Sequence, residues 1–504
     1  MDPLFDLIKK MDAAEKGYFK KFSSIGKKHE KNVGEILFDA IDKMKEYDET
    51  LIRKKYRNEK FISYLPVAKQ QLHEQILRAL ANFHGETTIY QTVDSLLTQA
   101  QVLFQKSLIP SYRKLLFRAK ELAQESEYFS RLGDILEKEF HDVTSQIPSR
   151  EKDERIEKLN TEIELVSIKE LNLRQYIYLY ARQMSITAES YQIRDVEIEK
   201  RHREIMKHEL MQQEDGALSV KAKLYFYHNK FIYHSVFHEE KEAYATAQKM
   251  LATCESSVIY TKHEPFPFLT AYLYVLNGAY RNNDLAAMEK YLTQLRELKF
   301  DIESARTAQF MYYMKNALFY FSETKNEIEF IALVKEADET LQRLNYNIRK
   351  DYLLVIFDHM ALGLIKFGKY AQAIDWLELY RNKFRNNLRY DLQTAMHFHL
   401  LIAHYELGNY ELVQNLIVPV YRFVVRTGQQ GKFEKLALRT FRKIANPLVA
   451  KEHPELLEKL KNELTTNNKE KVTEQNKDLS VLLLDFIESK LQKKKYHEYL
   501  IAKD

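Results

Sequence analysis

The sequence predicts an all-α protein built from repeated antiparallel helical hairpins. Glycine and proline, which cost about 1 and 3 kcal/mol inside a helix, number only 12 and 9 among 504 residues, so long helices are expected. One short phrase also occurs twice, as KFGKYAQAIDWL at 366–377 and as ELGNYELVQNLI at 406–417. Because a single hydrophobic core stops growing beyond about 250–300 residues, a chain of this length that repeats a phrase favours a stacked array.

Each copy of the phrase predicts a helix, a tight turn and a second helix that runs back along the first. The glycine ends the first helix, since glycine takes the left-handed conformation that a helix end often requires. The tyrosine opens the second helix. In the first copy Ala373, three positions after the tyrosine, leaves room for a neighbouring helix, whereas Val413 stands at this position in the second copy. The residues that we expect to build these turns are Gly368, Tyr370, Ala373, Gly408 and Tyr410.

This order of glycine, tyrosine and alanine resembles the turn of the tetratricopeptide repeat. Weaker copies upstream place His238, Asn283 and Asn326 in the glycine position. Together with Gly368 and Gly408, these positions are 45, 43, 42 and 40 residues apart, whereas the usual repeat has a period of about 34. The resemblance implies a right-handed superhelical solenoid of antiparallel hairpins. The spacing of the turns predicts repeats of 40–45 residues and helices of about 17–20 residues.

Five segments are expected along the chain. They are an N-terminal helical region (1–148), a long connecting helix with short helices (149–216), the repeat array (217–463), a polar linker (464–478) and a C-terminal helix (479–504). The long helix is predicted because no glycine or proline falls between Ser149 and Arg182, and apolar residues recur every three or four positions from Ile156 to Val166. The opening LFDLIKKM and the closing LLLDFIESKLQKKKYHEYL are similar to the ends of a group of uncharacterised bacterial tetratricopeptide-like proteins, a likeness that implies no known activity.

The resemblance also implies a place for a ligand. Some tetratricopeptide proteins hold a peptide with polar residues nine or ten positions before the turn glycine, on successive first helices. Counting back from the five turns gives His228, Asn229, Tyr274, Asn316, Asp358, His359 and His399. These residues are our candidates for a peptide-binding groove, and a solvated helix face is the alternative. Aromatic residues concentrate on the same helices, where they either fill the space between hairpins or line the groove.

No motif in the sequence predicts an enzyme. The nearest approach to a phosphate-binding loop, TGQQGKF at 427–433, has too few residues between its glycines, and Phe433 stands where a metal-binding hydroxyl belongs. Histidine pairs either diverge around a helix or, like His397 and His404, are separated by about 10 Å along it, too far to bind one ion. We therefore expect no catalysis, no cofactor and no metal site.

A scaffold that binds a protein or peptide is the leading hypothesis. The alternative is a regulator whose basic N-terminal region binds nucleic acid while the array senses a partner, since the net charge is +5. The basic clusters are Lys20, Lys21, Lys27 and Lys28, then Arg53, Lys54, Lys55 and Arg57, and finally Lys493–Lys495. The single cysteine, Cys254, fits a reducing compartment, and no stretch approaches 18 apolar residues, so we expect a cytoplasmic protein without a membrane span.

Overall fold

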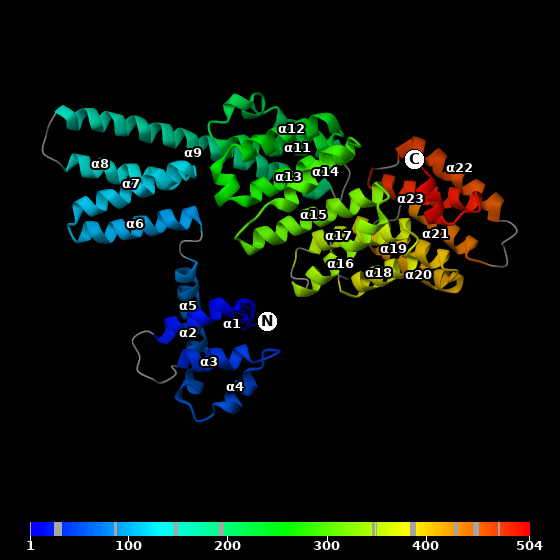
Figure 1. Cartoon of the computed structure of the whole chain (residues 1–504), viewed down its shortest axis with the longest axis horizontal. Helices are drawn as coiled ribbons and strands as arrows, with labels where there is room; N and C mark the ends of the chain where they lie inside the picture. Colours follow the sequence, from blue (N-terminus) through cyan, green and yellow to red (C-terminus); the bar gives the residue numbers. More distant parts are fainter. Residues whose placement is uncertain are drawn as a thin grey trace. The chain divides into compact units, whose positions relative to one another are not determined.

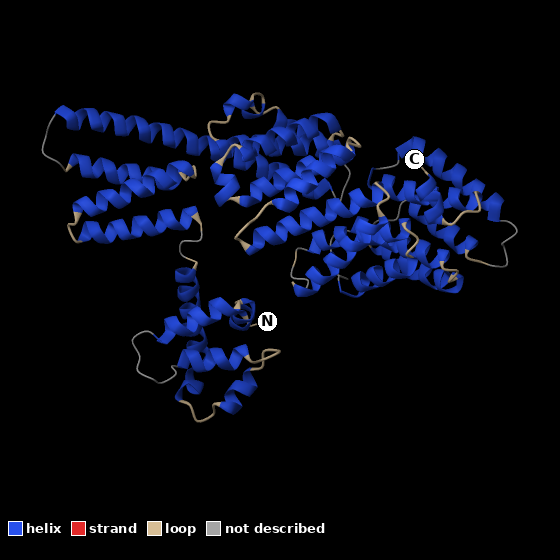
Figure 2. Cartoon of the chain, in the orientation of Figure 1, coloured by secondary structure: helices blue, strands red, loops and turns tan. Residues whose placement is uncertain are grey.

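The protein is helical throughout the part that its computed structural model describes. That part comprises residues 2–24, 33–84, 88–145, 150–190, 196–344, 348, 350–383, 390–427, 432–446, 453–471 and 474–503. No strand occurs among these residues, and consecutive helices pack against one another (Figure 2). The all-α prediction is therefore confirmed. Within the same ranges, every helix is too short or too polar to cross a lipid bilayer.

The chain divides into two compact units, and most of their helices are labelled in Figure 1. Unit 1 comprises Met1–Phe226 and Ser257–His263, and unit 2 comprises Tyr227–Ser256 and Glu264–Asp504. The helices of unit 1 are α1 (Pro3–Lys10), α2 (Ala13–Ser24), α3 (Val33–Asp42), α4 (Glu49–Lys55), α5 (Leu65–Phe83), α6 (Ile89–Gln105), α7 (Ile109–Glu125), α8 (Phe129–Thr144), α9 (Arg150–Ser190) and α10 (Val196–Met206), with short turns η1 (Lys60–Tyr64), η2 (Glu209–Met211), η3 (Glu214–Gly216) and η4 (Ile259–His263).

Helix α11 (Val220–Val236) contributes residues to both units. The remaining helices belong to unit 2, and those from α12 to α20 alternate between the second and the first helix of a hairpin. They are α12 (Glu240–Glu255), α13 (Pro265–Arg281), α14 (Leu285–Glu297), α15 (Glu303–Glu323), α16 (Glu327–Arg343), α17 (Lys350–Lys366), α18 (Tyr370–Lys383), α19 (Tyr390–Glu406), α20 (Tyr410–Arg426), α21 (Lys432–Ile444), α22 (His453–Lys471), α23 (Glu474–Leu491) and α24 (Tyr496–Ala502).

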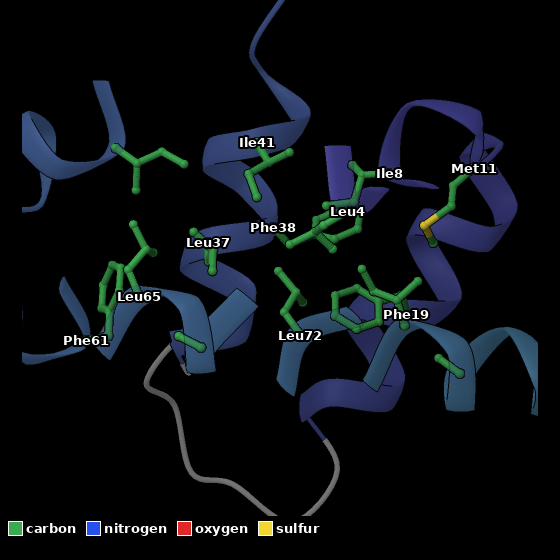
Figure 3. Close-up of a cluster of buried hydrophobic side chains, with 14 residues drawn as sticks. Leu4, Ile8, Met11, Phe19, Leu37, Phe38, Ile41, Phe61, Leu65 and Leu72 are labelled. Atoms are coloured by element: carbon green, nitrogen blue, oxygen red, sulfur yellow. The ribbon is translucent and has the colours of Figure 1, made fainter. Parts of the chain in front are cut away.

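The first five helices enclose a hydrophobic core of their own (Figure 3). Helices α2 and α3 pack against α5, and α1 packs against α3. Polar residues fix where two of these helices begin: Asp2 accepts hydrogen bonds from the first turn of α1, while Asp12 and Glu15 form a reciprocal capping box at α2, with both distances 2.8 Å. The labelled core residues are Leu4, Ile8, Met11, Phe19, Leu37, Phe38, Ile41, Phe61, Leu65 and Leu72.

Helices α6, α7, α8 and α9 pack one after another in a second group within unit 1 (Figure 1). Helix α9 runs without a break for 41 residues, in the segment where the sequence contains no glycine or proline. Leu159 and Val166 of α9 are buried in the shared core, and Ile156 and Ile163 pack against it. The apolar stripe read from the sequence is therefore the face that α9 turns toward its neighbours.

Five hairpins follow one another from α11 to α20, and each turns in the same way. One residue between the two helices takes the left-handed conformation, with φ between 54° and 78°; these residues are His238, Asn283, Lys325, Gly368 and Gly408. Four of them occupy the positions predicted for the turn. The fifth is a correction, because Lys325 rather than Asn326 takes this conformation. Asn326 instead caps α16 by accepting a hydrogen bond from the N–H of Glu329 at 3.2 Å.

Backbone hydrogen bonds hold these turns whether or not the residue is glycine. The N–H after the left-handed residue donates to a carbonyl oxygen five positions earlier, as from Asp284 to Ala279 and from Lys369 to Leu364, both at 2.8 Å. This bond satisfies a carbonyl group that would otherwise be unpaired at the helix end. It offsets the cost of about 1–2 kcal/mol that a side chain incurs in the left-handed conformation.

The first helices of successive hairpins pack against one another, α13 against α15, α15 against α17 and α17 against α19. Glycines in two first helices let second helices approach closely. A Cβ atom at Gly278 would lie 2.6 Å from the ring of Tyr244, and one at Gly363 would lie 2.1 Å from the ring of Phe330. The hairpins are therefore joined both along the row of first helices and through these close crossings.

The C-terminal region differs from its prediction. Most of the expected linker at 464–478 is helical, since α22 extends to Lys471 and α23 begins at Glu474. The segment contains no glycine or proline, and its lysine and glutamate residues favour a helix. The expected single helix at 479–504 is broken into α23 and α24 by a turn at Lys493, which takes the left-handed conformation.

The C-terminal hairpin packs back onto earlier first helices, α24 against α17 and α23 against α19. The hydroxyl of Tyr370 lies 3.0 Å from Nδ1 of His497 and accepts a hydrogen bond from its backbone N–H at 3.1 Å. Lys490 forms an ion pair with Glu406, whose side chain is nearly fully buried. Tyr370, expected as a turn residue, therefore also anchors the end of the chain.

Candidate functional site

The structure buries most of the residues predicted for a groove on the first helices. Four of the seven expose 8% or less of their surface, namely His228, Asn229, Asn316 and His399. Tyr274, Asp358 and His359 are half-buried. A buried atom does not meet a ligand unless the helices rearrange, so the half-buried side chains define the face that a ligand reaches.

Two contacts join predicted residues on neighbouring first helices. Nδ1 of His228 in α11 lies 3.2 Å from the hydroxyl of Tyr274 in α13, and their rings meet edge to face. Nδ1 of His399 in α19 lies 3.3 Å from a carboxylate oxygen of Asp358 in α17. Counting back from the turns therefore located positions at which successive first helices touch.

The sequence did not predict the side-chain contacts that α15 makes with α13 and α17. Nζ of Lys315 donates a hydrogen bond to the side-chain oxygen of Asn277 at 3.0 Å. The hydroxyl of Tyr352 donates to the hydroxyl of Tyr312 at 3.4 Å. Asn277 follows the predicted Tyr274 by three positions on the same helix face, so extending the search by one helical turn would have included it. We define the polar row as six half-buried residues, Tyr274, Asn277, Tyr312, Lys315, Tyr352 and Asp358.

Burial makes two histidines beside the polar row weak bases. It lowers the pKa of His228 to about 4. It also lowers the pKa of His359 to about 4, although the neighbouring Asp358 carboxylate acts in the opposite direction. Both imidazoles are therefore neutral at pH 7. The polar row and its surroundings offer hydroxyl, amide and neutral imidazole groups, together with the cation of Lys315 and the anion of Asp358.

Aromatic rings connect the helices that carry the polar row. Phe231 stacks on Tyr274 with ring centroids 3.7 Å apart, and Tyr280 meets Phe319 edge to face at 4.1 Å. Tyr280 is nevertheless 46% exposed. The aromatic residues of the first helices thus pack neighbouring hairpins together, and Tyr280 is at the same time exposed to solvent.

Groups suited to other chemistry are sparse in the described ranges. These ranges contain no group of three or more histidine, cysteine, aspartate or glutamate side chains arranged to hold a metal ion. Burial raises the pKa of the Cys254 thiol to about 12, so the reactive thiolate is disfavoured at pH 7. The glycines of the phosphate-loop candidate at 427–433 lie outside the described residues.

The basic clusters of the N-terminal region differ in their surroundings. Lys20 forms an ion pair with Asp39 at 2.8 Å, and Arg53 pairs with Glu49 at 2.8 Å. Lys27 and Lys28 lie outside the described residues. A basic patch begins in the last turn of α4 and consists of the exposed residues Lys54, Lys55, Arg57 and Lys60.

Comparison with family models, curated proteins and solved structures found no match to this chain. The tetratricopeptide likeness therefore rests on the turn residues and their spacing. On the first helices of the hairpins, the polar row joins α13 to α15 and α15 to α17.

Proposed function

We propose that the chain is a non-enzymatic cytoplasmic scaffold that holds a protein or peptide partner on the first helices of a tetratricopeptide-like array. In this proposal the hairpins from α11 to α20 stack as a right-handed superhelical solenoid, and the first helices line its concave face. The observation that supports it is the polar row, which runs across α13, α15 and α17 and bridges each helix to the next. An enclosed reaction centre would instead gather its polar groups at one point.

The chemistry of the polar row suits a polypeptide ligand. An extended peptide offers a backbone donor and acceptor at nearly every residue, and tyrosine hydroxyls and asparagine amides can serve as partners for both. Tyrosine also supplies a large, rigid contact surface at a low cost in conformational entropy. Lys315 favours an acidic group of the partner nearby, and Asp358 favours a basic group farther along the row.

A capture experiment with matched charge reversals tests this proposal. The immobilised full chain is exposed to native lysate of the organism that makes it, and each captured polypeptide is then purified and titrated by calorimetry. Lys315→Glu places the opposite charge in the polar row and should weaken binding by about tenfold or more, equivalent to about 1.4 kcal/mol. Lys335→Glu is the control, because Lys335 lies on the second helix α16 with a side chain that is 79% exposed.

Two results would count against the array as a binding surface. One is that the full chain captures no polypeptide. The other is that Lys315→Glu and Tyr312→Phe both leave the affinity of every captured partner at its original value. Circular dichroism of each variant shows whether the helices remain folded, so a loss of structure is not mistaken for a loss of contact.

A second candidate is a regulator whose N-terminal helices bind nucleic acid while the array senses a partner. The basic patch of Lys54, Lys55, Arg57 and Lys60 favours it, because exposed cations at the end of one helix are placed to contact phosphates.

Fluorescence anisotropy with a labelled duplex and a labelled single strand would show an affinity that falls steeply with salt. The double change Lys54→Glu and Lys55→Glu should flatten that slope, whereas Lys493→Glu and Lys494→Glu should not. If the chain binds neither the duplex nor the single strand at low salt, this candidate is excluded.

A further inference from the structure

Helix α9 carries a regular row of residues that are exposed in the part of the chain that the structure describes. The spacing alternates between four and three positions along the helix, which is the spacing of a coiled-coil seam. Ile168, Leu171 and Tyr178 expose 55%, 60% and 60% of their surface. We define the α9 seam as the eight exposed residues Glu157, Thr161, Glu164, Ile168, Leu171, Gln175, Tyr178 and Arg182.

Charge is distributed unevenly along the α9 seam. Its N-terminal half carries the carboxylates of Glu157 and Glu164, its centre is apolar, and its C-terminal end carries the guanidinium of Arg182. Glu157 and Arg182 are separated by about 38 Å along the helix. Charges this far apart cannot neutralise each other within one helix, because the separation exceeds the screening length of about 8 Å at physiological salt.

A second copy of the helix, running in the opposite direction, matches this distribution. With a twofold axis between Lys169 and Glu170, each seam residue faces a complementary residue of the other copy. The facing pairs are Glu157 with Arg182, Thr161 with Tyr178, Glu164 with Gln175, and Ile168 with Leu171, each formed twice. A parallel arrangement would instead set Glu157 against Glu157 and Arg182 against Arg182, which is unfavourable.

We propose that the chain forms a homodimer through the α9 seam, with the two copies of α9 antiparallel. The unpartnered Ile168 and Leu171 supply the apolar centre, and the two Glu157–Arg182 pairs select the antiparallel direction. Because the apolar centre is small, the dimer is reversible and its population depends on protein concentration. This inference does not rest on the proposed binding function, since α9 lies outside the hairpins that carry the polar row.

Sedimentation velocity of the full chain over a range of concentrations tests the dimer. The expected result is a mass that rises toward twice that of the single chain as the concentration increases. Leu171→Glu should hold the mass at that of one chain, because it places a charge at the apolar centre. Leu412→Glu is the control, since Leu412 is a comparably exposed leucine on α20 and this variant should still dimerise. Thermal melts recorded by circular dichroism show that both variants are folded.

Charge reversal tests the antiparallel direction. Glu157→Arg and Arg182→Glu should each raise the dissociation constant by about tenfold, because each creates two like-charge contacts. The double variant should recover the original dissociation constant, since the pair is then restored with its signs exchanged. Any of three results would overturn the proposal. The mass could stay at that of one chain at every concentration, or the dimer could persist in Leu171→Glu. The third is a double variant whose dissociation constant is as high as those of the single variants.

Discussion

The five hairpins from α11 to α20 form two groups that differ in the residue at the turn. Glycine takes the left-handed conformation in α17/α18 and α19/α20, whereas His238, Asn283 and Lys325 take it in the three hairpins before them. The hydrogen bond that closes the turn is the same in both groups. Helix packing and this bond therefore set the geometry, and the residue at the turn mainly determines how much that geometry costs.

Acid should destabilise both groups, because burial lowers the pKa of a histidine in each, His228 in α11 and His359 in α17, and this is the largest effect that we expect. Burial lowers the pKa of His228 to about 4, below its value of about 6.5 in the unfolded chain. The unfolded chain therefore binds more protons between pH 6.5 and 4, so stability is complete above pH 6.5 and falls as the pH drops through this window. For His228 the full loss is about 3 kcal/mol.

Hydrogen exchange of α11 and α13 peptides at several pH values measures this loss. His228→Gln should make their protection less dependent on pH. His238→Gln is the control, because His238 lies at an exposed turn next to the same helix. Equal pH dependence in His228→Gln and the original chain would show that another group carries the effect.

Each group of hairpins has a first-helix glycine in close contact with a second helix, Gly278 in one group and Gly363 in the other. Substituting such a glycine tests whether helix packing contributes more to stability than the turn residue does. Gly363→Ala should lower the free energy of unfolding by about 2–3 kcal/mol, because its Cβ would meet the fully buried ring of Phe330 at 2.1 Å. Urea unfolding followed by the fluorescence of Trp376, the chain's one tryptophan, reports on the adjoining helix α18. Gly133→Ala is the control in mid-helix, where a Cβ meets nothing within 4 Å, and it should stabilise α8 by up to about 1 kcal/mol.

The two glycine turns should differ from each other. Gly368 and Gly408 have φ values of 71° and 78°, so alanine at either position incurs about 1–2 kcal/mol of backbone strain. Only at Gly368 does the new Cβ meet a neighbour, the His497 ring at 3.0 Å. Gly368→Ala should therefore be the more destabilising in urea unfolding, and His497→Ala should remove most of the difference. Equal effects of the two glycine replacements would show that the C-terminal hairpin does not press on this turn.

We expect the smallest effect when a non-glycine turn residue is replaced by glycine, the residue that the other group has at its turns. Lys325→Gly removes the strain of a side chain at φ 56° and should raise the free energy of unfolding by about 0.5–1 kcal/mol, after the entropy cost of glycine is included. Asn283→Gly should gain less, because asparagine tolerates the left-handed conformation better than lysine. The Trp376 signal in urea measures both. A loss of stability in Lys325→Gly would mean that the lysine side chain contributes more than its backbone costs.

The sequence was informative about the hairpins because their signals are local. A glycine followed by a tyrosine marks a helix end, and an uninterrupted apolar stripe predicts the length and packed face of α9. Lys325 was not predicted as the turn residue because lysine has no preference for the left-handed conformation. Asn326 beside it was predicted instead, because asparagine tolerates that conformation, but its side chain caps the next helix.

The features missed by sequence reasoning depend on how helices some 40 residues or more apart are set against each other. Lys315 could be matched with Asn277, or Tyr370 with His497, only once the relative rotation of the helices was known. The same rotation buries Asn229 and His399 instead of exposing them. The residue types therefore predicted where helices meet, but not which side chains solvent reaches.

Hydrogen exchange of the full chain, with and without a captured partner, is the sharpest test of where the partner binds. If the partner lies on the polar row, protection should increase in the first helices α13, α15 and α17 and stay unchanged in the second helices α14, α16 and α18. Protection that increases only in the second helices, or only in unit 1, would contradict the assignment of the binding face.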